Sequence, residues 1–260
     1  MTESLAVSDG AQIAFDVRGK ESAPPLVLVH SLGCDHHMWD HQTGTLSQTH
    51  RVVALDIRGH GASDAPGGDY TLERLGRDVV DVADGLGIEA FDYCGLSIGG
   101  LIGLWLGLHT GGRLRSLTLC NTGAKISEAE RWNERIEIAS TAGMSALVDG
   151  VIERWFTADY VDAHPEEIER ARAQLLVTDP GGYAGCCAAI RDADLREEVH
   201  AITTRTLIVA GTHDVATPVE LSDFLHAQLT QSALTLLDAG HLSNVEQPDA
   251  FTAAITEFLS

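Results

Sequence analysis

The sequence predicts an α/β fold: a mostly parallel central sheet flanked by helices, with a helical cap inserted into it. Short apolar runs typical of buried strands alternate with helical patterns along most of the chain. One of these runs ends in Gly95-Leu96-Ser97-Ile98-Gly99, which is typical of a sharp strand-to-helix turn. The alternation stops from about Gly123 to Asp192, where only helical patterns occur. We therefore expect a core of residues 1–122 and 193–260, and a cap of residues 123–192.

The composition is typical of a globular chain with a large core. Its 260 residues, 44% of them hydrophobic, are enough for one large domain or for a core that carries an insertion. The longest strongly apolar run, Ile98 to Leu108, is too short to span a bilayer. The first residues lack a basic region followed by an apolar one, so we expect no signal peptide.

Charge and cysteine usage restrict the partners and the compartment. A net charge of −21 argues against nucleic acid and anionic membranes as partners. The five cysteines, with Cys186 and Cys187 adjacent, fit neither a disulfide framework nor a zinc-binding pair. We expect them to be reduced and mostly buried in a cytoplasmic protein.

The N-terminal third predicts a hairpin, two buried strands and one amphipathic helix. Asp9-Gly10 is a strong hairpin turn signal. Continuous apolar runs are typical of buried strands, and Thr71 is a suitable N-cap for a helix with apolar residues at spacings of three and four. The expected elements are strands at Ser4–Val7, Ala11–Val17, Leu26–Val29 and Arg51–Leu55, and a helix at Thr71–Leu86.

The remaining two thirds return to strand–helix alternation on either side of the helical block. We expect a strand that ends at the Ser97 turn, a buried helix at Leu101–His109 and a strand at Leu114–Cys120. The helical block predicts helices near Ser127–Ala139, Met144–Phe156, Pro165–Val177 and Gly182–Ile190. After it, Thr206–Ala210 and Ala233–Leu237 predict strands, and Pro218–Leu229 and Pro248–Leu259 predict helices.

Ser97 is the candidate nucleophile. A strand that turns into a helix within a few residues exposes the hydroxyl at the apex of the turn, and flanking glycines let strand and helix pass closely. The helix N-terminus behind the serine adds free N–H groups and positive dipole where an oxyanion would form. The alternative is a glycine-rich turn with an unreactive serine.

His241 is the candidate base. A serine needs a base within hydrogen-bonding reach and a third group to orient that base, and this turn predicts the chain order serine, acid, histidine. After the cap only four histidines remain, and His241 alone follows a strand on a free loop. His200 precedes the strand that should carry the acid, His213 shares a turn with that acid, and His226 lies inside a helix.

Asp214 is the candidate acid, because it follows the strand Thr206–Ala210 and so reaches the same edge of the sheet. Asp238 is too close in sequence to His241 to orient its ring easily, and after the strand Leu114–Cys120 stands Asn121 instead of an acid. The alternative is that Asp214 only caps the turn that begins at Val215.

Two backbone N–H groups are expected to stabilise the oxyanion. One belongs to Ile98, the residue after the nucleophile, and the other to Leu32, in the loop after the strand Leu26–Val29. Gly33 would let that loop approach closely, although Leu32 also fits simple packing beneath the cap.

No metal ion or cofactor is predicted. The histidines His36, His37 and His60 raise the question of a metal site, but no carboxylate or cysteine joins them at ligand spacing. We expect His60 and Arg58 to brace the loop after the strand Arg51–Leu55.

Taken together, these motifs resemble the α/β-hydrolase family along essentially the whole chain. The motifs that carry the resemblance are His30-Ser31-Leu32-Gly33, Asp56-Ile57-Arg58-Gly59-His60-Gly61-Ala62-Ser63-Asp64, the Ser97 turn, Gly211-Thr212-His213-Asp214 and Gly240-His241. The family usually has glycine after the histidine of the first motif, where this chain has Ser31. The resemblance implies an α/β-hydrolase fold and acyl transfer by Ser97, Asp214 and His241.

Segments in the core and the cap are further similar to the 3-oxoadipate enol-lactonases. They are Ser31–Asp35 with Met38-Trp39-Asp40, Gly95–Gly100, Arg154–Thr157, Gly182–Ile190 and His241–Pro248. The resemblance implies a cytoplasmic serine hydrolase that opens 3-oxoadipate enol-lactone to 3-oxoadipate in aromatic compound catabolism, the β-ketoadipate pathway.

The implied substrate is a small anionic lactone, so this acidic chain must provide a local cation. Among Arg131, Arg135, Arg154 and Arg191, we expect Arg135 to bind the substrate carboxylate, because Trp132 lies three residues before it on the same helix face. Trp132 would form a wall for the lactone ring. The alternative is a solvated helix face on which arginines pair with Glu128, Glu130, Glu134 and Glu137.

Two other functions remain open. One is a different carboxylesterase or lactonase of the same fold, which would need no cationic cap. The other is a receptor that holds a small ligand beneath the cap, since function belongs to sites and not to folds. The sequence does not predict an oligomeric state.

Overall fold

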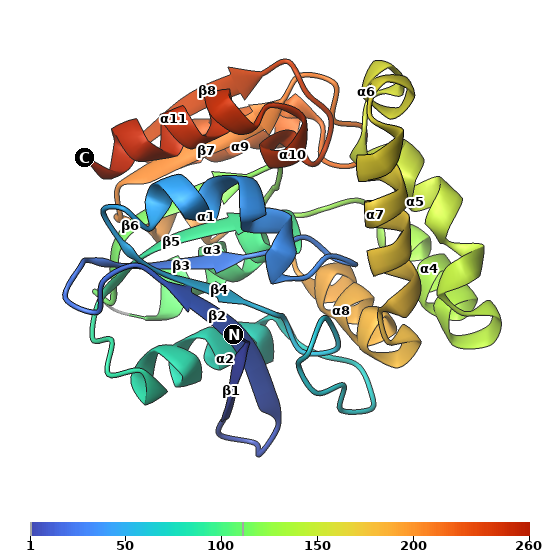
Figure 1. Ribbon diagram of the computed structural model, residues 1–260, viewed down its shortest axis with the longest axis horizontal. Coiled ribbons are helices and arrows are strands. Elements are labelled where there is room, and N and C mark those ends of the chain that lie inside the picture. Colours follow the sequence, from blue (N-terminus) through green and yellow to red (C-terminus); the bar gives the residue numbers. More distant parts are fainter. Residues whose placement is uncertain (1, 111) are drawn as a thin grey trace.

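The computed structural model describes residues 2–110 and 112–260, and its centre is an eight-stranded sheet in the order β1-β2-β4-β3-β5-β6-β7-β8 (Figure 1). The strands from β4 to β8 run parallel, whereas β1–β2 and β2–β4 pair antiparallel, so the predicted hairpin forms one edge. The strands are β1 Glu3–Ala6, β2 Gln12–Arg18, β3 Pro25–Val29, β4 Arg51–Leu55, β5 Phe91–Leu96, β6 Leu114–Cys120, β7 Thr206–Gly211 and β8 Ser232–Leu237.

Helices cover both faces of the sheet. Helix α1 packs against α11, and α2 packs against α3; in Figure 1, α1 lies in front of the sheet and α3 behind it. Most of α3 is buried, because its residues are apolar nearly all round. The bounds are α1 Asp40–Leu46, α2 Leu72–Gly85, α3 Ile98–His109, α9 Val219–Gln228, α10 Ser243–Glu246 and α11 Pro248–Leu259, with a short 3-10 helix η3 at Val199–Ala201.

Residues 123–192 contain only helices among their regular elements, and they lie beyond the carboxyl ends of the parallel strands (Figure 1). Helix α8 packs against α4, and α5 packs against α7. The bounds are α4 Ala129–Ala142, η2 Met144–Ala146, α5 Val148–Trp155, α6 Ala158–Ala163, α7 Pro165–Val177 and α8 Pro180–Asp192. The four predicted helical patterns are therefore confirmed, and α6 is an additional short helix.

The local signals of the N-terminal third are confirmed. Gly10 adopts φ 92° in the hairpin turn, a conformation that glycine adopts without strain. The Thr71 hydroxyl accepts a hydrogen bond from the Arg74 N–H at 3.1 Å, so Thr71 is the N-cap of α2.

All five cysteines are free and buried, and no helix in the described part of the chain is long and apolar enough to cross a membrane.

Helix α1 and the 3-10 helix η1 (His36–Trp39) were not expected from the sequence. The segment Asp40–Leu46 contains two threonines and a glycine, which favour helix weakly, and it lacks an apolar stripe. Tertiary packing stabilises it instead: Leu46 is buried, and the Gln42 amide donates to the Asn244 carbonyl at 2.9 Å.

Candidate active site

Ser97 lies at the apex of the turn between β5 and α3. It adopts φ 59° and ψ −114°, a strained conformation for a residue with a side chain. A Cβ at Gly95 would collide with the Gly99 backbone, and a Cβ at Gly99 would collide with the backbone of Val29 in β3. The two glycines therefore let β5, α3 and β3 approach closely enough to hold the serine in this conformation.

Asp214 and His241 meet at the carboxyl ends of β7 and β8. The His241 Nδ1–H donates to Asp214 Oδ2 at 2.8 Å, and both side chains are buried. Burial opposes ionisation of the carboxyl group, but the charge of His241 and the hydrogen bonds from His241 and Thr217 outweigh it and lower the pKa of Asp214 to about 2. The carboxylate is therefore ionised at neutral pH and fixes the orientation of the imidazole.

The Asp214 carboxylate also caps its own turn, so the alternative role considered for it coexists with the contact to His241. Its Oδ1 accepts the N–H groups of Ala216 and Thr217, each at 2.8 Å. Its Oδ2 accepts the Thr217 hydroxyl at 2.6 Å and the Asn121 side-chain amide at 2.9 Å. With the His241 bond, these contacts leave the carboxylate no freedom to turn away from the ring.

The other residues considered for these roles lie elsewhere. Asp238 and His213 form an exposed pair at 2.7 Å, and His226 hydrogen-bonds the Ser232 hydroxyl at 2.9 Å. Asn121 was noted in the sequence only because an acid is absent there. In the structure it has φ 45° and links Asp214 to the Gly240 carbonyl, at 2.9 and 3.3 Å, next to His241.

Two neutral histidines brace the loop that carries Leu32. The His30 Nε2 accepts the Ile57 N–H at 2.9 Å, and the His60 Nε2 accepts the Gly33 N–H at 2.9 Å. Burial lowers the pKa of both rings, to about 3 for His60. Each ring therefore keeps an unprotonated nitrogen that can accept a backbone N–H. The expected bracing role of His60 is confirmed, and it joins the loop after β3 to the loop after β4.

The amides of Leu32 and Ile98, the two expected oxyanion donors, belong to two different elements. Ile98 is the first residue of α3, whose N–H has no acceptor within the helix. Leu32 lies in the loop after β3, between Ser31 and Gly33. Among the hydrogen bonds of the described residues, neither amide donates to another protein group, so both are available to a ligand.

A small cavity lies between the core and the helical segment 123–192. Its two sides differ in origin. One side, the sheet wall, consists of Ser31, Leu32, Ser97, Ala216, Thr217 and His241. The other side, the helical wall, includes Ser127, Arg131, Trp132, Arg135, Arg154 and Trp155. Ser97 and His241 therefore open into the same space.

The helical wall brings three arginines together. Arg131 and Arg135 come from α4 and Arg154 from α5, and in the described part of the chain none of them forms an ion pair with a carboxylate. Burial and the positive charge of neighbouring arginines lower the pKa of Arg131 and Arg154. The Nε atoms of Arg135 and Arg154 are buried without a hydrogen-bond partner, and Arg135 Nη1 donates a long hydrogen bond to the Tyr183 hydroxyl at 3.4 Å. The cationic groups of this wall therefore lack a paired carboxylate among the described residues.

Trp132 and Arg135 lie side by side, as the helix spacing predicts. The Arg135 guanidinium lies over the Trp132 ring, 5.2 Å from its centroid, and the Trp132 indole N–H donates to the Ile126 carbonyl at 2.6 Å. The sequence favoured Arg135 alone, whereas the structure adds Arg131 and Arg154. Arg191 lies outside the cavity lining and pairs with Asp69 and Asp192, at 3.0 and 2.7 Å.

Glu246 connects the helical segment to the loop of His241. One carboxylate oxygen accepts the Thr157 N–H at 2.7 Å, and the other accepts the Gly240 N–H at 3.0 Å. The Leu242 N–H donates to the Trp155 carbonyl at 3.0 Å. These bonds fix the loop on both sides of His241 to the junction between α5 and α6.

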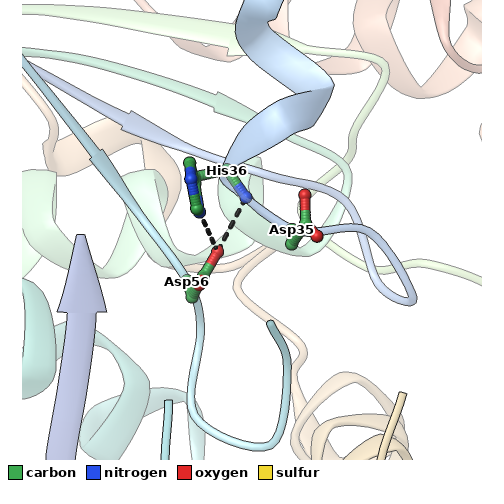
Figure 2. A group of neighbouring side chains, drawn as sticks. All are labelled: Asp35, His36 and Asp56. Atoms are coloured by element: carbon green, nitrogen blue, oxygen red, sulfur yellow. Dashed lines mark hydrogen bonds and ion pairs between the residues drawn. The ribbon is translucent and has the colours of Figure 1, made fainter. Parts of the chain in front are cut away.

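Asp35, His36 and Asp56 form a group with atoms close enough to hold a metal ion (Figure 2). However, Asp56 Oδ1 already accepts the His36 N–H at 2.7 Å and its ring N–H at 2.8 Å, and Oδ2 accepts the Ala62 N–H at 2.9 Å. Burial opposes the charge of His36, yet Asp56 raises its pKa, and the contact lowers that of Asp56. Within this group, His36 and Asp56 form an ion pair between η1 and the loop after β4. The expectation that no carboxylate joins these histidines was wrong, because sequence spacing does not reveal contacts between separate loops.

Comparisons with known proteins agree with this geometry. The model of the alpha/beta hydrolase family matches residues 26–254. The chain belongs to the alpha/beta hydrolase family.

Within this family, the chain is similar to 3-oxoadipate enol-lactonase 1 of Acinetobacter baylyi, at 39% identity over 96% of this chain and 94% of that protein. Among solved structures, the enol-lactonase of Burkholderia xenovorans superposes with a TM-score of 0.97, at 41% identity and with 99% of each chain covered. A hydrolase of Pseudomonas aeruginosa superposes equally well, with a TM-score of 0.97 and 41% identity over 100% of this chain and 98% of that one. The predicted family resemblance and the α/β-hydrolase fold are thus confirmed.

Proposed function

We propose that this α/β hydrolase opens 3-oxoadipate enol-lactone to 3-oxoadipate through an acyl-enzyme on Ser97. The observation that carries the proposal is the cavity itself. One wall holds a strained serine and a carboxylate-bound imidazole, and the other holds three arginines without carboxylate partners. The similarity to named enol-lactonases over almost the whole chain supports the same substrate.

In the first step, His241 takes the proton of Ser97 while Ser97 Oγ attacks the lactone carbonyl carbon. The electron pair of the carbonyl moves to its oxygen, which the N–H groups of Leu32 and Ile98 stabilise as an oxyanion. Asp214 holds the imidazole in the tautomer with the proton on Nδ1 and stabilises the imidazolium that forms.

The ring then opens, because the carbonyl re-forms and the bond to the ring oxygen breaks. The leaving group is an enolate, stabilised by delocalisation, and His241 returns the proton; the enol tautomerises to the ketone. Water activated by His241 then hydrolyses the acyl-enzyme through a second oxyanion, which releases the new carboxylate and restores Ser97.

The substrate carries a carboxylate of its own, and we propose that it binds the helical wall, at Arg135 together with Arg131 and Arg154. Guanidinium groups match carboxylates in bidentate geometry. The net charge of −21 repels anions at long range, so this local cluster supplies the attraction. The Trp132 ring, held by its bond to Ile126, would form a wall for the lactone ring.

We further propose that residues 123–192 form a cap on the core formed by residues 1–122 and 193–260. We also propose that the protein acts in the cytoplasm, which the five free cysteines support, and in aromatic compound catabolism. Its only expected partner is the small anionic lactone; neither nucleic acid nor a membrane is needed.

The test is the loss of the enol-lactone with wild-type protein and with Ser97→Ala. We expect rapid turnover by the wild type and a loss of several orders of magnitude in the variant. A neutral aryl ester, measured in parallel, separates the proposal from a general esterase, which would turn over that ester at least as well. A receptor would bind the lactone without turning it over, and Ser97→Ala that kept full turnover would refute the mechanism.

A further inference from the structure

Ser31 carries a hydroxyl with no partner at the edge of the cavity. The residue is 1% exposed, and its Oγ is one of the buried side-chain atoms of the described chain without a hydrogen-bond partner. Buried hydroxyls are normally paired, because leaving one unpaired costs its desolvation free energy. Ser31 lines the cavity together with Ser97 and His241, so a ligand there can supply the missing acceptor.

Other unpaired hydroxyls of the described chain lie away from this cavity. Ser222 in α9 and Thr118 in β6 are equally buried and unpaired, but neither lines the cavity. The unpaired atoms that do line it include Ser31 Oγ and the Nε atoms of Arg135 and Arg154. Among these unpaired side-chain atoms, the sheet wall thus holds a neutral hydroxyl, and the helical wall holds guanidinium nitrogens.

The backbone beneath the Ser31 side chain is fixed. Its carbonyl accepts the His30 ring N–H at 2.7 Å and the Cys34 N–H at 3.0 Å. Only the rotation about χ1 remains to direct the hydroxyl. The next residue, Leu32, also lines the cavity, and its free amide is a donor to the oxyanion in the proposed reaction.

We propose that the Ser31 hydroxyl is a third donor to the oxyanion, beside the N–H groups of Leu32 and Ile98. The inference rests on the proposed acyl transfer by Ser97. As Ser97 Oγ bonds to the carbonyl carbon and the carbonyl electron pair moves to oxygen, the Ser31 O–H shortens its hydrogen bond to that oxygen. Its proton stays on Ser31, and the bond weakens again when the carbonyl re-forms.

The test compares Ser31→Ala with Ser222→Ala, which also removes a buried unpaired hydroxyl. Both variants should keep or raise Tm, because each removes an unsatisfied polar group. Only Ser31→Ala should lower kcat, by about a hundredfold at nearly unchanged KM, as expected for the loss of one oxyanion donor. A merely structural role of Ser31 would instead lower Tm and kcat together, which would overturn the proposal.

Each variant is assayed on the enol-lactone and on a neutral aryl ester with a good leaving group. Both substrates form an oxyanion, so kcat should fall on both. Three results would contradict the proposal. A loss of kcat confined to the lactone would mean that Ser31 contacts the leaving oxygen, and a rise in KM alone would mean that it acts in substrate binding. A change in kcat of less than twofold would mean that Ser31 has no part in catalysis. The measurements with the neutral ester and with Ser97→Ala distinguish a failure of the Ser31 proposal from a failure of the proposed lactonase function.

Discussion

The charged groups in the two walls of the cavity differ in whether they are paired with other groups of the protein. In the sheet wall, His241 is held by Asp214, a carboxylate that accepts five hydrogen bonds from the described residues. In the helical wall, burial and neighbouring arginines disfavour the charges of Arg131 and Arg154, nearby glutamates offset this only in part, and among the described residues neither arginine forms an ion pair with a carboxylate.

This difference separates two tasks. Groups that act on the reacting atoms work best when they are already oriented before the substrate binds, since no reorganisation is then needed during the reaction. Groups that recognise a charged substrate contribute most to the binding free energy when the substrate itself supplies their partner, because a competing internal ion pair would have to break first. The sheet wall is therefore suited to catalysis and the helical wall to the selection of an anion.

The largest effect is expected from Asp214→Asn, which removes the carboxylate that orients His241 in the sheet wall. An asparagine amide can no longer hold the Nδ1–H tautomer of His241, and kcat should fall by about 10⁴-fold, as for the equivalent change in the Ser-His-Asp triads of serine proteases. Steady-state kinetics on the lactone measure this loss.

The matched control is Asp238→Asn, which changes the other aspartate–histidine pair of this region. The side chains of His213 and Asp238 are 58% and 86% exposed, whereas those of His241 and Asp214 are 4% and 0% exposed. Exposed pairs contribute little, so this control should keep kcat within about twofold. Equal losses in the two variants would contradict the distinction between these pairs.

A smaller effect is expected from Arg131→Gln and Arg154→Gln in the helical wall. Each should raise KM for the acidic lactone by roughly 10-fold, since a hydrogen bond to a charged group contributes about 1.5–3 kcal/mol, and should leave KM for a neutral ester unchanged. Because each substitution also removes a half-buried cation that has no carboxylate partner among the described residues, Tm should rise.

Arg191→Gln is the control for this pair, because Arg191 is already paired with Asp69 and Asp192 and does not line the cavity. Its KM for the lactone should not change. If Arg191→Gln raised KM as much as Arg154→Gln, net charge and not the arginine cluster would govern substrate binding.

The sheet wall was predictable from sequence because parallel strands bring their carboxyl ends to one edge. Ser97, Asp214 and His241 each follow a strand, so the order of strands and short loops was enough to bring the last two into contact and all three to one side of the molecule. The constraint is topological and needs no knowledge of side-chain packing.

The helical wall was less predictable, because its residues meet through the packing of separate helices. The spacing of Trp132 and Arg135 within α4 was readable, but Arg154 comes from α5, and no local pattern sets the angle between the two helices. The ion pair of His36 with Asp56 and the bond of Asn121 to Asp214 were missed for the same reason: each joins elements far apart in sequence. Helix α1 was missed because tertiary contacts stabilise a segment of weak helix propensity.

The smallest effect on activity at neutral pH is expected from His60, which braces the Gly33 loop next to the sheet wall, because the resulting loss of stability develops only below pH 6.5. Burial lowers the pKa of His60 from 6.5 to about 3, so between these values the unfolded chain binds a proton that the folded chain does not. The contribution is complete above pH 6.5 and is lost as the pH falls toward 3, by about 1.4 kcal/mol per pH unit. Urea unfolding of wild type and His60→Gln measures it: the variant should show a shallower decline over this range, whereas the exposed His226→Gln should match the wild type. An unchanged slope in His60→Gln would mean that the Gly33 loop does not depend on a neutral imidazole.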